Sequence, residues 1–256
     1  SFLGEDLLEN AILGISVVVG LTASTLMGVV FLVAMMPVAT QQGINYEVST
    51  HHVPLHQKVF DFVYRSNHYQ LLADEATLGT STDQERVLAV FDWTQRNIPR
   101  TPKGWTVVDD HILNIIIRGH GTADQRADVF TTLSTYAGVP AFWAKVRLQK
   151  SQDGIILSFA LVDGRWVVFD VDNGVAFRND RGDLATPGDL RNRRDLIPSR
   201  LYDLKVGGTP YPRFLEHLQR PPVPNPLRAE LQMSGQRLRY ELRRVLSVGE
   251  SDGFQR

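Results

Sequence analysis

The longest apolar stretch of the chain runs from Ala11 to Met36 and contains no charged residue. As an α-helix rising about 1.5 Å per residue it would be roughly 39 Å long, more than the ~30 Å hydrocarbon core of a bilayer. The pattern therefore predicts a transmembrane helix over residues 11–36. A cleavable signal peptide fits less well, because the flank over residues 1–10 carries three acidic side chains and neither Lys nor Arg.

Small side chains recur at every fourth position of this predicted helix: Ser16, Gly20, Ser24 and Gly28. Such a ridge lets a second helix approach closely. We therefore expect it to pack on an integral-membrane protein complex or on a second copy, while the other faces contact the lipid bilayer. Alternatively these residues have no packing role, since glycine and serine are common in membrane helices.

Residues 37–54 are mainly polar and predict a linker between the membrane helix and a soluble domain. The linker contains His51 and His52, and His56 follows it. Adjacent side chains of an extended chain point in opposite directions, and no carboxylate or cysteine joins these histidines at ligand spacing. We therefore predict no metal site here.

Alternating patterns after the linker predict a domain over residues 55–215. A helix is expected over residues 56–72, with an inward face formed by Val59, Phe60, Val63 and Tyr64. A second helix over residues 81–100 begins with an Ser81 or Thr82 cap near Glu85. A third is closed by Gly138 and Pro140, and residues 155–170 predict two strands around an Asp-Gly turn.

The third helix carries the most specific pattern. Residues 121–141 (GTADQRADVFTTLSTYAGVPA) resemble the nucleophile helix of the transglutaminase-like (papain-related) family. The preceding helix and the following strand pair come in the order of that family, so the resemblance covers about residues 81–174. It implies an α+β fold in which helices pack on an antiparallel sheet, here preceded by a single transmembrane helix.

The resemblance also implies a catalytic triad that this chain lacks. Ala123 stands where the family has its cysteine, Ser158 or its neighbour Leu157 falls at the histidine, and Asp170 matches the acidic member. The chain contains no cysteine, whereas the family's reaction needs a thiolate, an imidazole and an acid that orients the imidazole. We therefore expect a pseudoenzyme, with Asp170 serving as a structural residue.

A rewired active site is the alternative at this position. Four residues gather in sequence around Ala123: His120, Asp124, Gln125 and Asp128. A hydrolase using a carboxylate and His120 can be imagined. However, a carboxylate at a helix start is favoured by the free amide groups and the macrodipole, and a histidine between two glycines is more often a polar contact.

Residues 216–256 predict a proline-rich segment followed by a basic amphipathic helix. The segment 220–226 (RPPVPNP) should be extended, and the helix should cover about residues 227–246. Arginines on this helix are candidates for contact with anionic lipid or an acidic partner, in particular Arg237, Arg239, Arg243 and Arg244. Packing of the helix on its own domain is the alternative.

Charge and motifs exclude several functions. The formal net charge is −1, which together with a membrane anchor disfavours nucleic-acid binding. No glycine-rich phosphate loop is present, so no cofactor is predicted. The C-terminal third is basic, which favours a cytoplasmic rather than a periplasmic position for the domain.

Two functions fit this sequence. The first is a non-catalytic membrane protein that serves as an accessory or scaffold subunit of a larger membrane complex, through its transmembrane helix and a pseudo-transglutaminase domain. The second is a cell-envelope protein that binds a peptide or glycan, or a rewired hydrolase, in a retained cleft lined by Trp105, Trp143 and Trp166.

Overall fold

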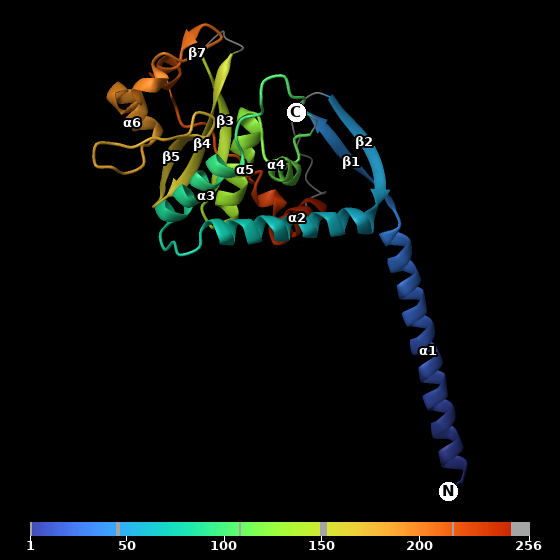
Figure 1. Cartoon of the computed structure of the whole chain (residues 1–256). Coiled ribbons are helices and arrows are strands. Elements are labelled where there is room, and N and C mark those ends of the chain that lie inside the picture. The colour runs from blue at the N-terminus through green and yellow to red at the C-terminus, as the bar shows by residue number, and fades with distance from the viewer. Residues whose placement is uncertain (1, 45–46, 108, 149–152, 217, 247–256) are drawn as a thin grey trace. The chain divides into compact units, whose positions relative to one another are not determined.

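The computed structural model describes residues 2–44, 47–107, 109–148, 153–216 and 218–246, apart from the side chains of 2–13, 44, 47 and 244–246. The chain separates into two compact units (Figure 1). Unit 1 comprises residues 1–41 and 49–61, and unit 2 comprises residues 42–48 and 62–256.

Helix α1 (Phe2–Ala34) forms most of unit 1. Its segment Gly14–Ala34 has a mean hydropathy of 2.3 and buries none of its residues inside the molecule. Among the described residues it is the one helix long and apolar enough to cross a membrane. Side chains that are both apolar and uncovered by the chain itself are what lipid contact requires.

The segment after α1 is more regular than the predicted linker. It forms β1 (Pro37–Ile44) and β2 (Glu47–Pro54), which pair in a two-stranded sheet. Alternating β-branched residues such as Val38, Thr40 and Val48 favour extended backbone here. The polar composition therefore did not predict this hairpin, although alternate residues of β1 such as Val38 and Thr40 are half-buried.

The end of α1 and the start of α2 (Leu55–Ala76) are joined within unit 1. The backbone N–H of Leu55 donates to the Met36 carbonyl at 2.9 Å. The His56 ring Nδ1 lies 3.0 Å from the Ala34 carbonyl oxygen, in one of the last turns of α1. The contact with Ala34 can satisfy a carbonyl group that the end of α1 leaves without an intrahelical partner.

Unit 2 is built on a four-stranded antiparallel sheet in the order β3-β4-β5-β6. Its strands are β3 (Ala141–Arg147), β4 (Gly154–Val162), β5 (Arg165–Asp170) and β6 (Val175–Ala176). Asp163 and Gly164 turn the chain between β4 and β5 with φ of 48° and 74°. Two consecutive positive φ angles are typical of the tight hairpin turn that the Asp-Gly pair predicts.

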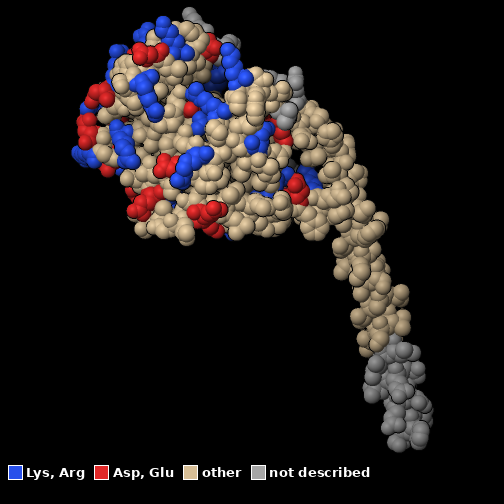
Figure 2. Space-filling view, viewed as in Figure 1, with Lys and Arg blue, Asp and Glu red and all other residues tan. Residues whose placement is uncertain are grey.

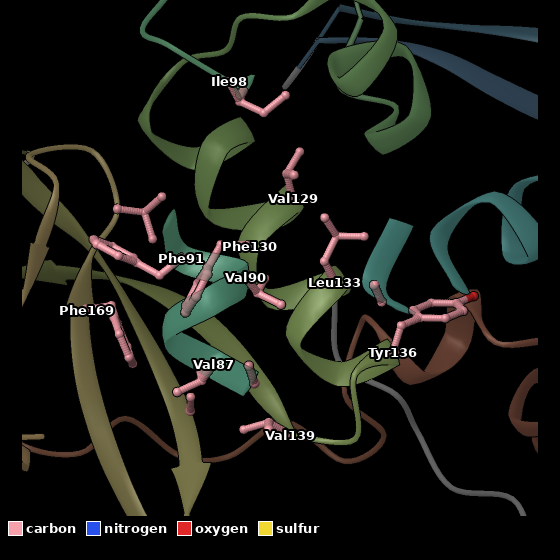
Figure 3. Packing of buried hydrophobic residues seen from close by; sticks show 14 of the residues in the cluster. Val87, Val90, Phe91, Ile98, Val129, Phe130, Leu133, Tyr136, Val139 and Phe169 are labelled. Atoms are coloured by element: carbon pink, nitrogen blue, oxygen red, sulfur yellow. The ribbon is translucent and has the colours of Figure 1, made fainter. Parts of the chain in front are cut away.

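One face of the sheet is covered by α3 (Asp83–Asn97) and α5 (Ala123–Tyr136). Figure 3 shows their apolar side chains meeting Phe169 of β5. The Phe130 ring lies 5.0 Å from Phe169 and 5.9 Å from Phe91, measured between centroids. Thr82 and Glu85 form the expected capping box at the start of α3.

The other face of the sheet carries a second apolar cluster, built mainly from the C-terminal half of the chain. Short elements supply it: α6 (Pro187–Asn192), the 3₁₀ turns η1 (Arg194–Leu196) and η2 (Ser199–Leu201), β7 (Lys205–Val206), β8 (Thr209–Pro210) and α7 (Pro212–Glu216). Leu157, Phe159 and Val168 of the sheet point into this cluster. Unit 2 therefore has two cores separated by its sheet.

The inward face predicted for α2 is wrong. Its four residues are between 40% and 70% exposed, with Val63 least and Phe60 most exposed. The helix instead buries Ser66, Tyr69 and Ala73, and the Tyr69 ring lies against Tyr136 of α5 at 5.6 Å. A face containing serine and tyrosine can be buried because the Tyr136 hydroxyl donates to Ser66 Oγ at 3.0 Å.

The C-terminal helix begins later than the sequence predicts. Residues 227–233 contain the short 3₁₀ turn η3 (Glu230–Gln232), and α8 covers only Ser234–Leu246. Met233 has an extended backbone, which separates the two helical pieces. The remaining short helix, α4 (Ile112–Arg118), precedes α5 and packs on it.

Candidate functional site

Ala123 is the first residue of α5 and is half-buried. Its place at a helix N-terminus is suited to a nucleophile, because free backbone N–H groups and the helix dipole stabilise a thiolate. A methyl side chain cannot use this environment. The helix start is instead held by the Thr122 hydroxyl, which donates to Asp124 Oδ1 at 2.5 Å.

The sheet register identifies which residue faces Asp170. Ser158 of β4 pairs with Phe169 of β5, so one step further along this register Leu157 comes opposite Asp170. Leu157 is fully buried in the second apolar cluster. Of the two positions considered for the missing histidine, Leu157 is therefore the one beside the acid.

Ser158 points to the other face of the sheet, toward α5, as alternation along a strand requires. Its neighbours across the sheet are Trp143 and Phe169, both directed toward the first cluster and α5. The Ser158 hydroxyl is buried and has no hydrogen-bond partner among the described residues. No described base forms a hydrogen bond with it that could activate it.

Asp170 is buried and fully engaged by its surroundings. The Tyr211 hydroxyl and the Asn173 side-chain amide both donate to Oδ2, at 2.5 and 2.7 Å, and the Asn173 backbone N–H donates to Oδ1 at 2.8 Å. Burial raises the pKa of Asp170, against the effect of these donors. The carboxyl group thus ties the loop after β5 to the segment after β8.

The four residues gathered around Ala123 have separate partners. Gln125 accepts from Arg118 Nη2 at 3.0 Å and donates to Asp110 Oδ1 at 2.7 Å. The His120 Nδ1 lies 3.1 Å from the Thr101 hydroxyl, and burial together with the Arg118 charge lowers the pKa of His120. Within the described bonds, His120 contacts none of the acids that a rewired hydrolase would need.

Asp128 occupies the most unusual electrostatic environment of this region. It lies in the second turn of α5, buried, and accepts from the Trp143 indole N–H at 2.6 Å. Arg228 forms an ion pair with it at 2.9 Å. Burial raises the pKa of Asp128 to about 6, although Arg228 and Trp143 oppose the shift.

A small cavity adjoins this carboxylate. Its volume is about 200 Å³, and its walls include Asp128, Thr132, Trp143, Pro224 and Arg228. Ligand pockets usually measure ~300–1,000 Å³, so the cavity fits a few water molecules better than a peptide or sugar segment. Sequence analysis placed Asp128 near the site but could not pair it with Arg228, which is 100 residues away in the chain.

The three tryptophans proposed to line a cleft do not meet. Trp105 is exposed and its ring contacts His120 at 5.2 Å. Trp143 binds Asp128 on the α5 side, whereas Trp166 packs on Phe142 at 5.0 Å on the opposite side of the sheet. Alternation along the strands explains this separation.

The arginines predicted to bind lipid or a partner lie on α8. Arg237 forms an ion pair with Glu241 at 2.6 Å, one turn along the helix. Arg239 and Arg243 are exposed, as are Leu238 and Leu242. The side chain of Arg244 lies outside the described residues.

Comparison with known proteins identifies the family of the central segment. Residues 70–171, which contain α3, α5 and strands β3 to β5, match the model of the transglutaminase-like superfamily. This segment is a transglutaminase-like domain. Its two helices and antiparallel strands are the α+β arrangement predicted from the resemblance.

Solved structures with similarity to the transglutaminase-like domain share little sequence with it. A candidate cysteine protease from Cytophaga hutchinsonii is 21% identical over 46% of this chain and 43% of its own, with a TM-score of 0.37. A candidate protease from Parabacteroides distasonis is 15% identical over 52% and 35%, with a TM-score of 0.32. A structure described as a TGase is 10% identical over 58% and 46%, with a TM-score of 0.36.

This chain covers less than half the length of each of these structures. No curated protein matches the sequence significantly.

Proposed function

We propose that the chain is a non-catalytic, membrane-anchored protein whose transglutaminase-like domain serves as a binding module in a larger membrane complex. The single observation that carries this proposal is the set of contacts made by Asp170, the residue that matches the family's acid. Asp170 faces the buried Leu157 and is bound by Tyr211 and Asn173. A carboxyl group held in this way has no imidazole to orient.

The missing nucleophile supports the same proposal. The chain has no cysteine, and Ala123 occupies the helix position that the family's cysteine would take. Acyl transfer through a covalent intermediate requires a nucleophile and a base within hydrogen-bond reach of each other. The described side chains near Ala123 supply a helix cap and a glutamine network, which stabilise structure.

Helix α1 supplies the proposed contact with the rest of the complex. A Cβ added at Gly20 or Gly28 would meet nothing within 4 Å, so this chain itself imposes no need for glycine there. Close approach of another helix would impose it. We infer that the ridge from Ser16 to Gly28 packs on an integral-membrane partner.

Helix α8 adds a second contact in this proposal. Its exposed leucines and arginines are typical of a helix lying on an anionic lipid surface. The basic C-terminal third favours the cytoplasmic leaflet, and we propose that side for the domain. A single cysteine introduced at exposed Asn192, tested with a membrane-impermeant maleimide on intact cells and on lysed cells, checks the orientation. Labelling of intact cells would place the domain outside.

An activity assay tests the non-catalytic part of the proposal. Ala123→Cys with Leu157→His should restore the family's side chains but not its chemistry. The Asp170 carboxylate already accepts a hydrogen bond from Tyr211 and would not orient the new histidine. We expect neither the natural chain nor this variant to cleave amides or transfer acyl groups. If the natural chain cleaves amides and Asp128→Asn abolishes this cleavage, the result would instead support the rewired hydrolase.

Purification from the native membrane in mild detergent tests the membership of a complex. We expect stoichiometric integral-membrane companions to accompany the chain. Isolation of the chain alone or as a simple dimer would contradict the proposal and would favour a cell-envelope binding protein. The small size of the Asp128 cavity argues only against a peptide or sugar bound at that position.

A further inference from the structure

Strand β3 lies at an edge of the four-stranded sheet. It pairs with β4 along its whole length, from Ala141 to Arg147, and the strand order gives it no second neighbour among the described strands. An edge strand presents a row of backbone N–H and C=O groups that another extended chain can pair with. Natural proteins usually cover such an edge.

The chain's own C-terminal segment passes near this edge without pairing with it. Residues 218–224 form neither helix nor strand, and the segment contains Pro221, Pro222 and Pro224. Proline has no backbone N–H to donate to a strand. The segment can therefore lie beside β3, but it is unsuited to becoming a fifth strand.

A groove of about 720 Å³ runs along the same edge. Five consecutive residues, 144–148, form one wall, and Arg213, Gln219 and Pro221 form the other. Side chains of consecutive strand residues point to opposite faces of the sheet. A wall formed by all five residues, and not by alternate ones, therefore lies along the edge of the strand. The volume lies within the ~300–1,000 Å³ that is usual for ligand sites.

The charges of the groove indicate what it binds. Lys145, Arg147 and Arg213 line it, and none of its described lining residues is acidic. Lys145 and Arg147 are exposed and take part in no ion pair with a described residue. Arg213 lies 3.6 Å from Glu216, whose carboxylate also binds Arg194 at 2.7 Å.

The surroundings extend this basic character. Figure 2 shows Lys and Arg side chains, with fewer acidic ones between them, over the end of the domain that carries β7. That end adjoins the start of β4, because a Cβ at Gly207 would lie 1.8 Å from Asp153 Oδ2. The favourable charge for an acidic chain therefore lies mainly in Lys145, Arg147 and Arg213 of the groove itself, whereas Asp153 places one carboxylate beside the β7 end.

We propose that the β3 edge binds an extended acidic peptide segment of a partner, which adds as a fifth strand in the groove. Backbone pairing would supply affinity, and Lys145, Arg147 and Arg213 would select carboxylate side chains. At ~3.3 Å per residue, the five residues of the wall accommodate about five residues of peptide. The inference rests on the proposed function, since it identifies the kind of segment that the non-catalytic domain binds.

Binding of a defined peptide to the full-length chain in detergent tests this inference. The probe is a fluorescein-labelled peptide of sequence Glu-Val-Glu-Val-Glu-Val, measured by anisotropy. We expect saturable binding that Lys145→Glu with Arg147→Glu weakens at least tenfold. Arg181→Glu with Arg191→Glu is the matched control, because it removes two exposed arginines elsewhere in the domain with the same change in net charge.

A second probe separates strand addition from simple charge attraction. N-methylation of alternate peptide bonds removes backbone donors but keeps every side chain, and we expect it to abolish binding when the methylated edge faces β3. The inference would be overturned if the methylated peptide binds as well as the unmethylated one in either methylation register. It would also be overturned if the 145/147 and 181/191 double variants lose the same amount of binding. Absence of binding at millimolar peptide would also overturn it.

The state of the probe after incubation distinguishes the two proposals. Mass spectrometry should recover it intact. A cleaved probe would contradict the non-catalytic function itself, whereas an intact probe that fails to bind would contradict only the groove inference.

Discussion

At the scale of single residues, Tyr211 and Asp170 form a buried hydrogen bond between distant parts of the domain. The hydroxyl of Tyr211 donates to the buried carboxyl group, and burial together with the Asp170 charge raises the pKa of Tyr211 well above its usual range. The bond joins residues 41 positions apart. It therefore holds the C-terminal part of the domain against the sheet.

Removal of this hydroxyl should destabilise the domain. Tyr211→Phe leaves the buried Asp170 without one of its donors, and we expect a loss of about 1–3 kcal/mol in the free energy of unfolding. Tyr202→Phe is the control, since that hydroxyl also donates one bond, to the Arg194 carbonyl at 2.8 Å, but at an exposed site. Its loss should cost less than about 0.5 kcal/mol. Denaturant unfolding followed by fluorescence measures both, and equal effects would contradict the argument.

Asp128 should make stability depend on pH. Its folded pKa of about 6 exceeds the ordinary value of 3.8, so between these values the folded state binds more protons than the unfolded state. Stability contributed by this group is therefore greatest below about pH 4, is lost as pH rises through about 6, and is constant above.

The size of this effect can be measured against a neutral variant. A shift of about two units corresponds to about 3 kcal/mol, at ~1.4 kcal/mol per unit. Relative to Asp128→Asn, the natural chain should lose up to about that much between pH 4 and pH 7 in denaturant unfolding. Comparison with the variant cancels the contributions of the other carboxylates. Parallel pH profiles of the two proteins would show that Asp128 has an ordinary pKa.

At the scale of elements, local sequence signals mark where the helices of the transglutaminase-like domain begin. Thr82 accepts from the Glu85 backbone N–H at 3.1 Å, and the Glu85 carboxylate accepts from Thr82 and Ser81 in return. These bonds lower the pKa of Glu85. The start of α3 is thus encoded within five residues.

Loss of this cap should be measurable. Thr82→Ala removes the acceptor of the capping box and should destabilise the domain by about 1 kcal/mol. Thr82→Ser keeps the hydroxyl and should stay close to the natural chain in thermal or denaturant unfolding. A similar loss in both variants would assign the effect to the threonine methyl group.

At the scale of the whole molecule, the prediction concerns α1 and what it contacts. Gly20→Leu with Gly28→Leu should detach the chain from the membrane partner that we propose, because two isobutyl groups would separate helices packed on the small-residue ridge. Membrane insertion and the stability of the domain should not change, since neither glycine contacts the chain itself. Co-purification with the partner measures the effect.

Val18→Leu with Val29→Leu is the control for this substitution. Both valines are exposed on α1 and lie on the helix side away from Gly20. These changes add volume without filling the ridge, so the complex should survive. Unchanged co-purification in the glycine variant, or equal loss in both variants, would contradict a specific packing face.

Most of the central helices and strands could be predicted because their signals are local. The α3 cap, the Gly138 stop after α5 and the Asp163-Gly164 turn each lie within a few residues. The buried face of α2 could not be predicted, because Ser66 and Tyr69 are buried through their contacts with Tyr136 and not through their hydrophobicity. The sequence left Ser158 and Leu157 open as the position of the family's histidine, and the choice matters since a one-residue change reverses the face of a strand.

The sequence by itself determined the absence of a thiol, the apolar length of α1 and the order of helices and strands that identifies a transglutaminase-like domain. Those properties depend on residue type and on short spacings. Only the tertiary structure decided that Leu157 faces Asp170, that Tyr211 donates to this acid, that Arg228 pairs with Asp128 and that β3 is the edge of the sheet among the described strands. Each of these depends on strand register or on contacts between distant segments, and pairing between distant segments is what folding, rather than local pattern, establishes.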